Sequence, residues 1–147
     1  MKKTVAFMLL LSWLFLMFGS SCKEADDCEG CDFKFVEYSN ATTFYEAYVS
    51  ESPNALIDIR ADSLYKCGHL DGAVNLPFEI SYTDTEKEQW GKTLLEKYNK
   101  NTFLFIYGSS SFELNNRVAK IAFRYGYERG KIRIFSKGYD ELKNVWK

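Results

Sequence analysis

The sequence predicts an α/β fold, a doubly wound five-stranded parallel sheet with helices on both faces. Strand-like and helix-like patterns alternate from residue 33 onward, which is the order that right-handed crossovers between parallel strands require. Residues 102–107 form an uninterrupted apolar run, which is typical of a central parallel strand buried on both faces. Functional side chains are therefore expected at the carboxyl ends of the strands, where open sheets of this kind bind their ligands.

Five segments have strand patterns. The first, at residues 33–38, alternates aromatic and polar side chains, as an edge strand does. The others are mainly apolar and lie at residues 55–60, 73–76, 102–107 and 131–135. Pro77 ends the third of the five, because proline cannot donate to a ladder of strand hydrogen bonds.

Four helices are predicted from apolar residues at helical spacing. They are marked by Phe44, Ala47 and Tyr48; by Trp90, Leu94 and Tyr98; by Leu114, Val118, Ile121, Ala122 and Tyr125; and by Tyr139, Leu142, Val145 and Trp146. Asn40 or Thr43 can cap the first helix, and Thr85 with Glu88 has the spacing of a capping box for the second. Gly126 provides a stop for the third.

The N-terminal segment, residues 1–21, has the layout of a secretory signal. Lys2 and Lys3 precede an apolar run at residues 5–18, which is short for a membrane span, and small residues then lead to Cys22. This ending resembles a bacterial lipobox, which implies cleavage before Cys22 and attachment of acyl chains to it. The chain would then be a bacterial lipoprotein held by the lipid bilayer, in the periplasm or at the outer membrane or cell surface. The alternative is an ordinary signal that leaves Cys22 as a thiol.

Residues 22–32 are predicted to be an acidic tether, and residues 33–147 the folded domain. The tether is polar, as a flexible linker is, and its acidic residues are Glu24, Asp26, Asp27, Glu29 and Asp32. Residues 23–27 also resemble an acidic tag for display on the outer surface. The whole chain carries a formal charge of −1 without a basic patch, so nucleic acid is not an expected partner.

Two motifs of the domain occur at a characteristic spacing. Residues 56–60 read LIDIR, and residues 68–77 read GHLDGAVNLP. Together with Gly138 and Trp146 near the end, they resemble the rhodanese domain, a sulfur-carrying α/β fold. The resemblance covers residues 33–147, nearly all of the expected mature chain.

The resemblance implies roles for five motif residues. Asp58 and Arg60 stand at the functional edge of the sheet, as an ion pair or loop anchor rather than an acid–base pair. Gly68, His69 and Gly72 shape the turn into the third strand, and His69 is expected to bond to nearby backbone.

The cysteine that forms the persulfide in this family is absent. Counting forward from Tyr107 puts Gly108 at its position, and counting back from Gly126 puts Ser109 there. The degenerate loop comprises Gly108, Ser109, Ser110, Ser111, Phe112 and Glu113. The resemblance implies a run of about six residues from the cysteine into a helix, where backbone N–H groups hold an anionic sulfur. A serine hydroxyl cannot carry sulfane sulfur, because transfer proceeds through an S–S bond.

Three other cysteines leave alternatives open. Cys28 and Cys31 form a C-x-x-C pair that suits a disulfide in an oxidising compartment, or a redox pair. Cys67 is then left unpaired and is expected to be part-buried. No metal or cofactor is expected.

The predicted function is a membrane-tethered, non-catalytic rhodanese-like module that binds or scaffolds an unknown protein or small molecule. The alternative is a sulfurtransferase or disulfide carrier that uses Cys28 and Cys31, or Cys67, in place of the loop cysteine.

Overall fold

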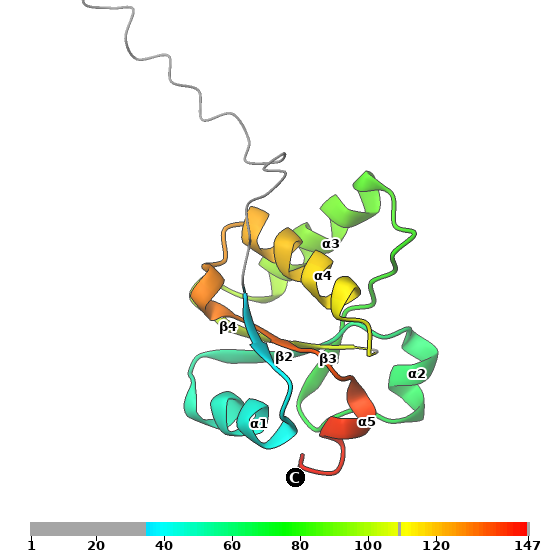
Figure 1. Ribbon diagram of the computed structural model, residues 1–147. Helices are drawn as coiled ribbons and strands as arrows, with labels where there is room; N and C mark the ends of the chain where they lie inside the picture. Colours follow the sequence, from blue (N-terminus) through cyan, green and yellow to red (C-terminus); the bar gives the residue numbers. More distant parts are fainter. Residues whose placement is uncertain (1–34, 109, 147) are drawn as a thin grey trace, which may run out of the picture. The chain divides into compact units, whose positions relative to one another are not determined.

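The computed structural model describes residues 35–108 and 110–146, which contain one parallel sheet (Figure 1). Its strands are β1 Val36–Tyr38, β2 Asn54–Asp58, β3 Ala73–Asn75, β4 Phe103–Tyr107 and β5 Ile132–Phe135. They are arranged in the order β1-β5-β4-β2-β3, and every neighbouring pair is parallel. The predicted α/β fold with a five-stranded parallel sheet is confirmed.

The helices cover both faces of this sheet. They are α1 Ala41–Ser50, α2 Asp62–Cys67, α3 Asp84–Lys97, α4 Phe112–Arg124 and α5 Tyr139–Leu142, with a 3-10 turn at Arg129–Lys131. In Figure 1, α3 and α4 lie over one face, whereas α1, α2 and α5 lie on the other. None of the helices in the described ranges is long and apolar enough to cross a membrane.

The alternation of side chains along the central strands divides the core in two. Ile57 and Ile106 face the α3 and α4 layer, whereas Leu56 and Phe105 face the opposite layer. All four side chains are buried, as the apolar runs predict for strands covered on both sides.

Two helix starts show how local polar groups select a boundary. The Asn40 side chain accepts hydrogen bonds from the backbone N–H groups of Thr42 and Thr43, so Asn40 caps α1. The prediction that Thr85 starts the next helix is wrong, because Thr83 forms the capping box with Glu86. The same four-residue spacing occurs twice in this segment, two residues apart, and the earlier pair is the one used.

The sequence patterns missed α2 and overextended the last helix. Helix α2 has six residues and buries none of them, so it has no apolar stripe to reveal it. Helix α5 ends at Leu142, and Val145 and Trp146, expected on the same helix, lie beyond it. The backbone N–H groups of both residues still bond to the carbonyl of Leu142, so the chain stays tightly turned there.

Candidate functional site

The neighbouring strands β2 and β4 form the switch point of the sheet. The chain leaves β2 toward β3 by way of α2 and leaves β4 toward β5 by way of α4, on opposite faces (Figure 1). Loops that diverge in this way open a crevice at the carboxyl ends of the strands. A pocket of about 400 Å³ lies there. It is lined by Arg60, Leu64, Cys67, Gly68, Gly108, Ser110, Lys137, Gly138, Tyr139 and Asp140.

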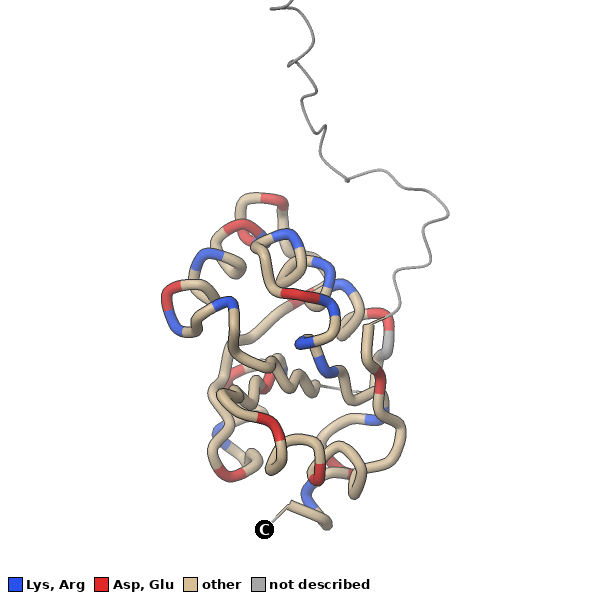
Figure 2. The backbone as a smooth tube through the Cα atoms, turned by 90° about the vertical axis from the view of Figure 1, so that its left-hand side faces the viewer, with Lys and Arg blue, Asp and Glu red and all other residues tan. Residues whose placement is uncertain are grey.

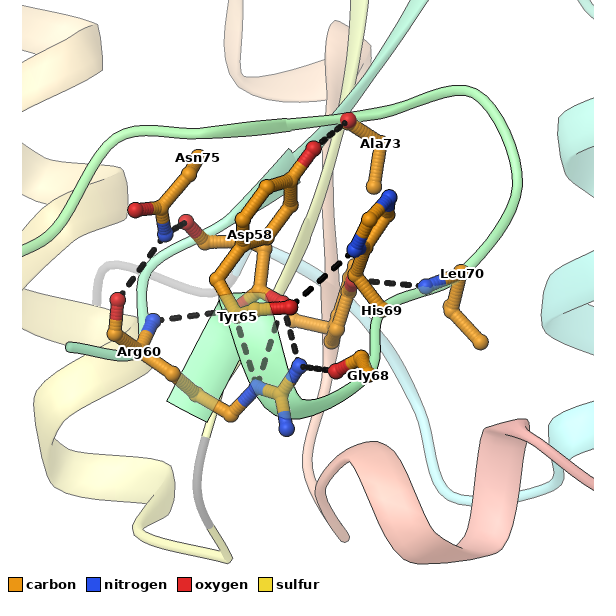
Figure 3. Close-up of polar contacts among 9 residues, drawn as sticks. Asp58, Arg60, Tyr65, Gly68, His69, Leu70, Ala73 and Asn75 are labelled. Carbon is orange, nitrogen blue, oxygen red and sulfur yellow. Dashed lines mark hydrogen bonds and ion pairs between the residues drawn. The ribbon is translucent and has the colours of Figure 1, made fainter. Parts of the chain in front are cut away.

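An ion pair between Asp58 and Arg60 lies at the end of β2 (Figure 3). The side chain of Asp58 is 0 % exposed and that of Arg60 is 8 % exposed. Arg60 Nη2 donates to Asp58 Oδ2 at 2.6 Å, and Arg60 Nε donates to both carboxylate oxygens, at 3.0 and 3.1 Å. The backbone N–H of Arg60 also donates to Asp58 Oδ1 at 2.9 Å. The carboxylate therefore holds both the side chain and the backbone of Arg60.

Arg60 joins three segments around the pocket. Its Nη2 donates to the carbonyl of Gly68 at 2.8 Å, and its guanidinium carbon lies 3.9 Å from the centre of the Tyr139 ring. Burial by itself lowers the pKa of Arg60, but the hydrogen bonds and the charge of Asp58 outweigh it, so the pKa is raised. Arg60 thus stays charged and acts as an anchor rather than as a proton donor.

The GHLDG turn is held by bonds to backbone atoms (Figure 3). His69 Nδ1 lies 3.1 Å from the carbonyl of Tyr65, and the two rings stack with centroids 3.9 Å apart. The hydroxyl of Tyr65 donates to the carbonyl of Ala73 at 2.7 Å. Gly72 has a φ of 79°, a left-handed conformation that glycine adopts without steric cost. His69 therefore has the backbone partner that the sequence leads one to expect.

Asn75 and Tyr107 complete the support beneath the site. Asn75 Nδ2 donates to the carbonyls of Asp58 and Arg60, at 3.0 and 2.9 Å. The hydroxyl of Tyr107 accepts a hydrogen bond from the backbone N–H of Leu70 at 3.3 Å. Burial, together with the charge of Asp58, raises the pKa of Tyr107 far above its usual value, so this phenol stays protonated. Its position as the last residue of an apolar strand is the sequence signal that could have drawn attention to it.

The loop after β4 is short and contains hydroxyl groups but no thiol. Helix α4 begins at Phe112, and the Ser111 hydroxyl caps it by accepting from the backbone N–H of Leu114 at 3.4 Å. Ser110 lines the pocket, and the carbonyl of Gly108 accepts from the backbone N–H of Tyr139 at 3.2 Å. Ser109 lies outside the described residues. The pocket thus presents backbone and hydroxyl groups at the end of β4.

Comparison with family models identifies this arrangement. The model of the rhodanese-like domain matches residues 41–145, which contain strands β2 to β5 and the site. The chain belongs to the rhodanese-like family. Comparison with curated proteins finds no match.

Solved structures agree on the fold of this rhodanese-like domain. A rhodanese-like domain from Anabaena sp. has a TM-score of 0.55 at 19% identity, covering 73% of each chain. A yeast protein described as a protein tyrosine phosphatase of the rhodanese family has a TM-score of 0.56 at 16% identity, covering 76% of this chain and 87% of its own. A protein from Bacillus halodurans has a TM-score of 0.53 at 14% identity, covering 76% and 73%. Identities this low bear on the fold alone.

Two expectations about the loop of this rhodanese-like domain are corrected. The segment between β4 and α4 has four residues, 108–111, instead of the about six that the resemblance implies. Phe112 and Glu113 accordingly belong to the first turn of α4. Glu113 is exposed and forms an ion pair with Arg117 at 2.8 Å, as residues four apart on a helix can.

Cys67 is the one cysteine within the described residues. Its position corrects another expectation. It is exposed, not part-buried, because it ends a helix that buries no residue. It also lines the pocket with Gly108 and Ser110. Cys22, Cys28 and Cys31 lie outside the described residues. Within those residues, no group of three or more His, Cys, Asp or Glu side chains is placed to hold a metal ion.

We expect Asp58→Ala to lower the free energy of unfolding by about 3 kcal/mol or more, because it leaves the Arg60 charge buried without its partner. Chemical denaturation measures this loss, and adding Arg60→Met should recover part of it. Asp140→Ala is the matched control, since it removes an exposed carboxylate bonded to Lys143 at 2.6 Å and should change stability little. Equal losses in the two single variants would contradict a structural role for the buried pair.

Proposed function

We propose that this rhodanese-like domain is a non-catalytic binding module tethered to a membrane. The observation that supports the absence of catalysis is the end of β4, where Gly108 and Ser110 occupy the start of the loop and no cysteine follows Cys67 in the chain. A persulfide requires a thiolate, and a serine hydroxyl without an adjacent base stays protonated at neutral pH. The pocket would then bind a group without transferring sulfur.

The charges around the pocket favour an anionic group as its ligand. Asp58 neutralises Arg60, and Lys143 forms an ion pair with Asp140. Lys137 lines the pocket and has no hydrogen bond or ion pair with any other residue of the described ranges. The N-terminus of α4, next to Ser110, adds partial positive charge.

Figure 2 shows basic and acidic positions interspersed along the backbone of the domain. Within the pocket, an acidic group of a partner protein or a small oxyanion would meet the side chain of Lys137.

The tether is proposed from the sequence. Cys22 after small residues would carry acyl chains, and residues 22–32 would hold the domain away from the bilayer. The proposed location is the periplasm, or the outer membrane or surface, of a bacterial cell.

A second candidate function rests on Cys67, which lines the same pocket as Gly108 and Ser110. A thiol there could take up sulfane sulfur in place of the missing loop cysteine. Its position opposes this role, because it ends α2 and lies outside the loop between β4 and α4, whose backbone N–H groups would hold an anionic sulfur. The non-catalytic function is therefore preferred.

Sulfur transfer from thiosulfate to cyanide, which yields sulfite and thiocyanate, distinguishes these candidates. We expect the unaltered chain to form thiocyanate no faster than a chain with Cys67→Ser. Ser110→Ala is the matched control variant in the same pocket and should give the same rate. Activity that disappears in Cys67→Ser would establish the second candidate. Activity that survives there but disappears when Cys28 and Cys31 are serine would assign it to the tether.

Anion binding is expected to raise the temperature of thermal unfolding. A ligand at a hundredfold excess over its Kd stabilises the folded state by about 2.7 kcal/mol. We expect thiosulfate and sulfate to produce a saturable increase that Lys137→Glu removes. Lys120→Glu, on the exposed surface of α4, changes the net charge equally and should retain the increase. Because sulfate also stabilises proteins without a site, equal responses of the two variants would contradict this proposal.

Lipidation is tested by the intact mass of protein extracted from membranes. We expect a mass that matches a chain beginning at Cys22 with attached acyl groups, and loss of membrane association in Cys22→Ser. The same spectrum reports a Cys28–Cys31 disulfide as the loss of two hydrogens. A soluble, unacylated chain from cells that process lipoproteins would contradict the tether.

A further inference from the structure

The space beside Gly108 is filled by two side chains. A Cβ atom built on Gly108 would lie 2.7 Å from Ile59 Cγ1 and 3.1 Å from Ile59 Cδ1. It would also lie 3.0 Å from Asn115 Oδ1. Non-bonded carbon atoms are best separated by about 3.5–4.0 Å, so a side chain at position 108 would overlap Ile59.

Ile59 is held firmly in this position. Its side chain is 1 % exposed and belongs to the core between the sheet and the α3 and α4 layer. Its backbone N–H donates to the carbonyl of Tyr107, and its carbonyl accepts from the backbone N–H of Phe78, both at 3.0 Å. Because these bonds fix the backbone and the side chain is packed in the core, the side chain cannot move away at little cost.

Asn115 closes the same space from α4. It is 0 % exposed, and its Nδ2 donates to the carbonyl of Phe135 at 2.7 Å, which fixes the orientation of the amide. Its Oδ1 has no hydrogen-bond partner among the described residues. A buried acceptor without a partner is unfavourable. The oxygen of Asn115 therefore lies next to Gly108 because the hydrogen bond from Nδ2 to Phe135 fixes the amide, and not because the oxygen itself is bound there.

We infer that Ile59 and Asn115 block the position at which the family's nucleophile would stand. The inference rests on the proposed function and on the forward count from Tyr107, which puts Gly108 in the place of the persulfide cysteine. Neither residue lines the pocket, whereas Gly108 does, so the two side chains pack against Gly108 from the side away from the pocket lining. The loss of the thiol is accompanied by the loss of the space for it, and Gly108→Cys alone would not restore an accessible thiol.

The test uses the full chain with its four cysteines replaced by serine. Gly108→Cys is compared with Ser110→Cys, a thiol in the same loop that lines the pocket, and with Gly108→Cys combined with Ile59→Ala. We measure the rate of alkylation by iodoacetamide and the midpoint of thermal unfolding. Gly108→Cys should lower the midpoint by about 5 °C or more, as overpacking does. Its thiol should react about tenfold more slowly than that of Ser110→Cys, because it is buried.

Removing the Ile59 side chain separates the possible outcomes. We expect Ile59→Ala to raise the alkylation rate of Gly108→Cys about tenfold. The midpoint of the double variant should lie above the value expected from adding the losses of the two single variants. A Gly108→Cys chain as stable as its parent and as reactive as Ser110→Cys would overturn the inference.

A smaller substitution covers the case in which Gly108→Cys does not fold. Gly108→Ala in the unaltered chain should lower the midpoint, and adding Ile59→Ala should recover part of this loss. Gly130→Ala is the control and should not lower the midpoint, because a Cβ at position 130 meets nothing within 4 Å. An unchanged midpoint in Gly108→Ala would equally overturn the inference. The sulfur-transfer assay on the unaltered chain tests the proposed function separately, since it does not depend on the space at position 108.

Discussion

The buried ion pair between Asp58 and Arg60 is the interaction on which the site depends. It lies at the end of β2, where the chain leaves the sheet toward α2. Arg60 contacts the carbonyl of Gly68 and the ring of Tyr139 in addition to Asp58, so it joins the end of β2 to the turn before β3 and to α5. A guanidinium suits this position because it stays charged and donates in several fixed directions.

The same pair limits what the pocket can do chemically. Because Asp58 is fully occupied by Arg60, its carboxylate is not available as a base for a hydroxyl in the loop. Tyr107 stays protonated behind it, and His69 is directed to the carbonyl of Tyr65. Asp58, Tyr107 and His69 are thus engaged in holding neighbouring groups in place, which supports the proposed binding function.

The sheet could be predicted from the sequence because its signals are local. An unbroken apolar run such as residues 102–107 is typical of a strand covered on both faces. The spacing of Asp58 and Arg60 at a strand end likewise placed both side chains on one face, at the working edge of the sheet. Helix α2 had no such signal, because it buries none of its residues. Cys67, the last residue of this helix, is exposed for the same reason. The choice between Thr83 and Thr85 as a cap could not be made from the pattern, because both have the spacing of a capping box. The packing of Ile59 against Gly108 depends on a contact between two segments that no single window of sequence contains.

Under the proposed function, the family's sequence pattern would outlast the chemistry associated with it. The GHLDG turn is held by hydrogen bonds from Arg60 to the carbonyl of Gly68 and from the backbone N–H of Leu70 to the hydroxyl of Tyr107. Neither bond involves the loop after β4. Losing a thiol from that loop leaves these bonds intact, so the turn and the pocket rim persist without it. What changes is the space beside the loop, where a missing side chain allows a core residue such as Ile59 to pack closely. Close packing there stabilises the fold and opposes the return of a nucleophile, because any larger residue would have to displace buried atoms. Under the proposed function, a rhodanese-like domain with this arrangement would keep a rim for binding around a centre that packs as part of the core.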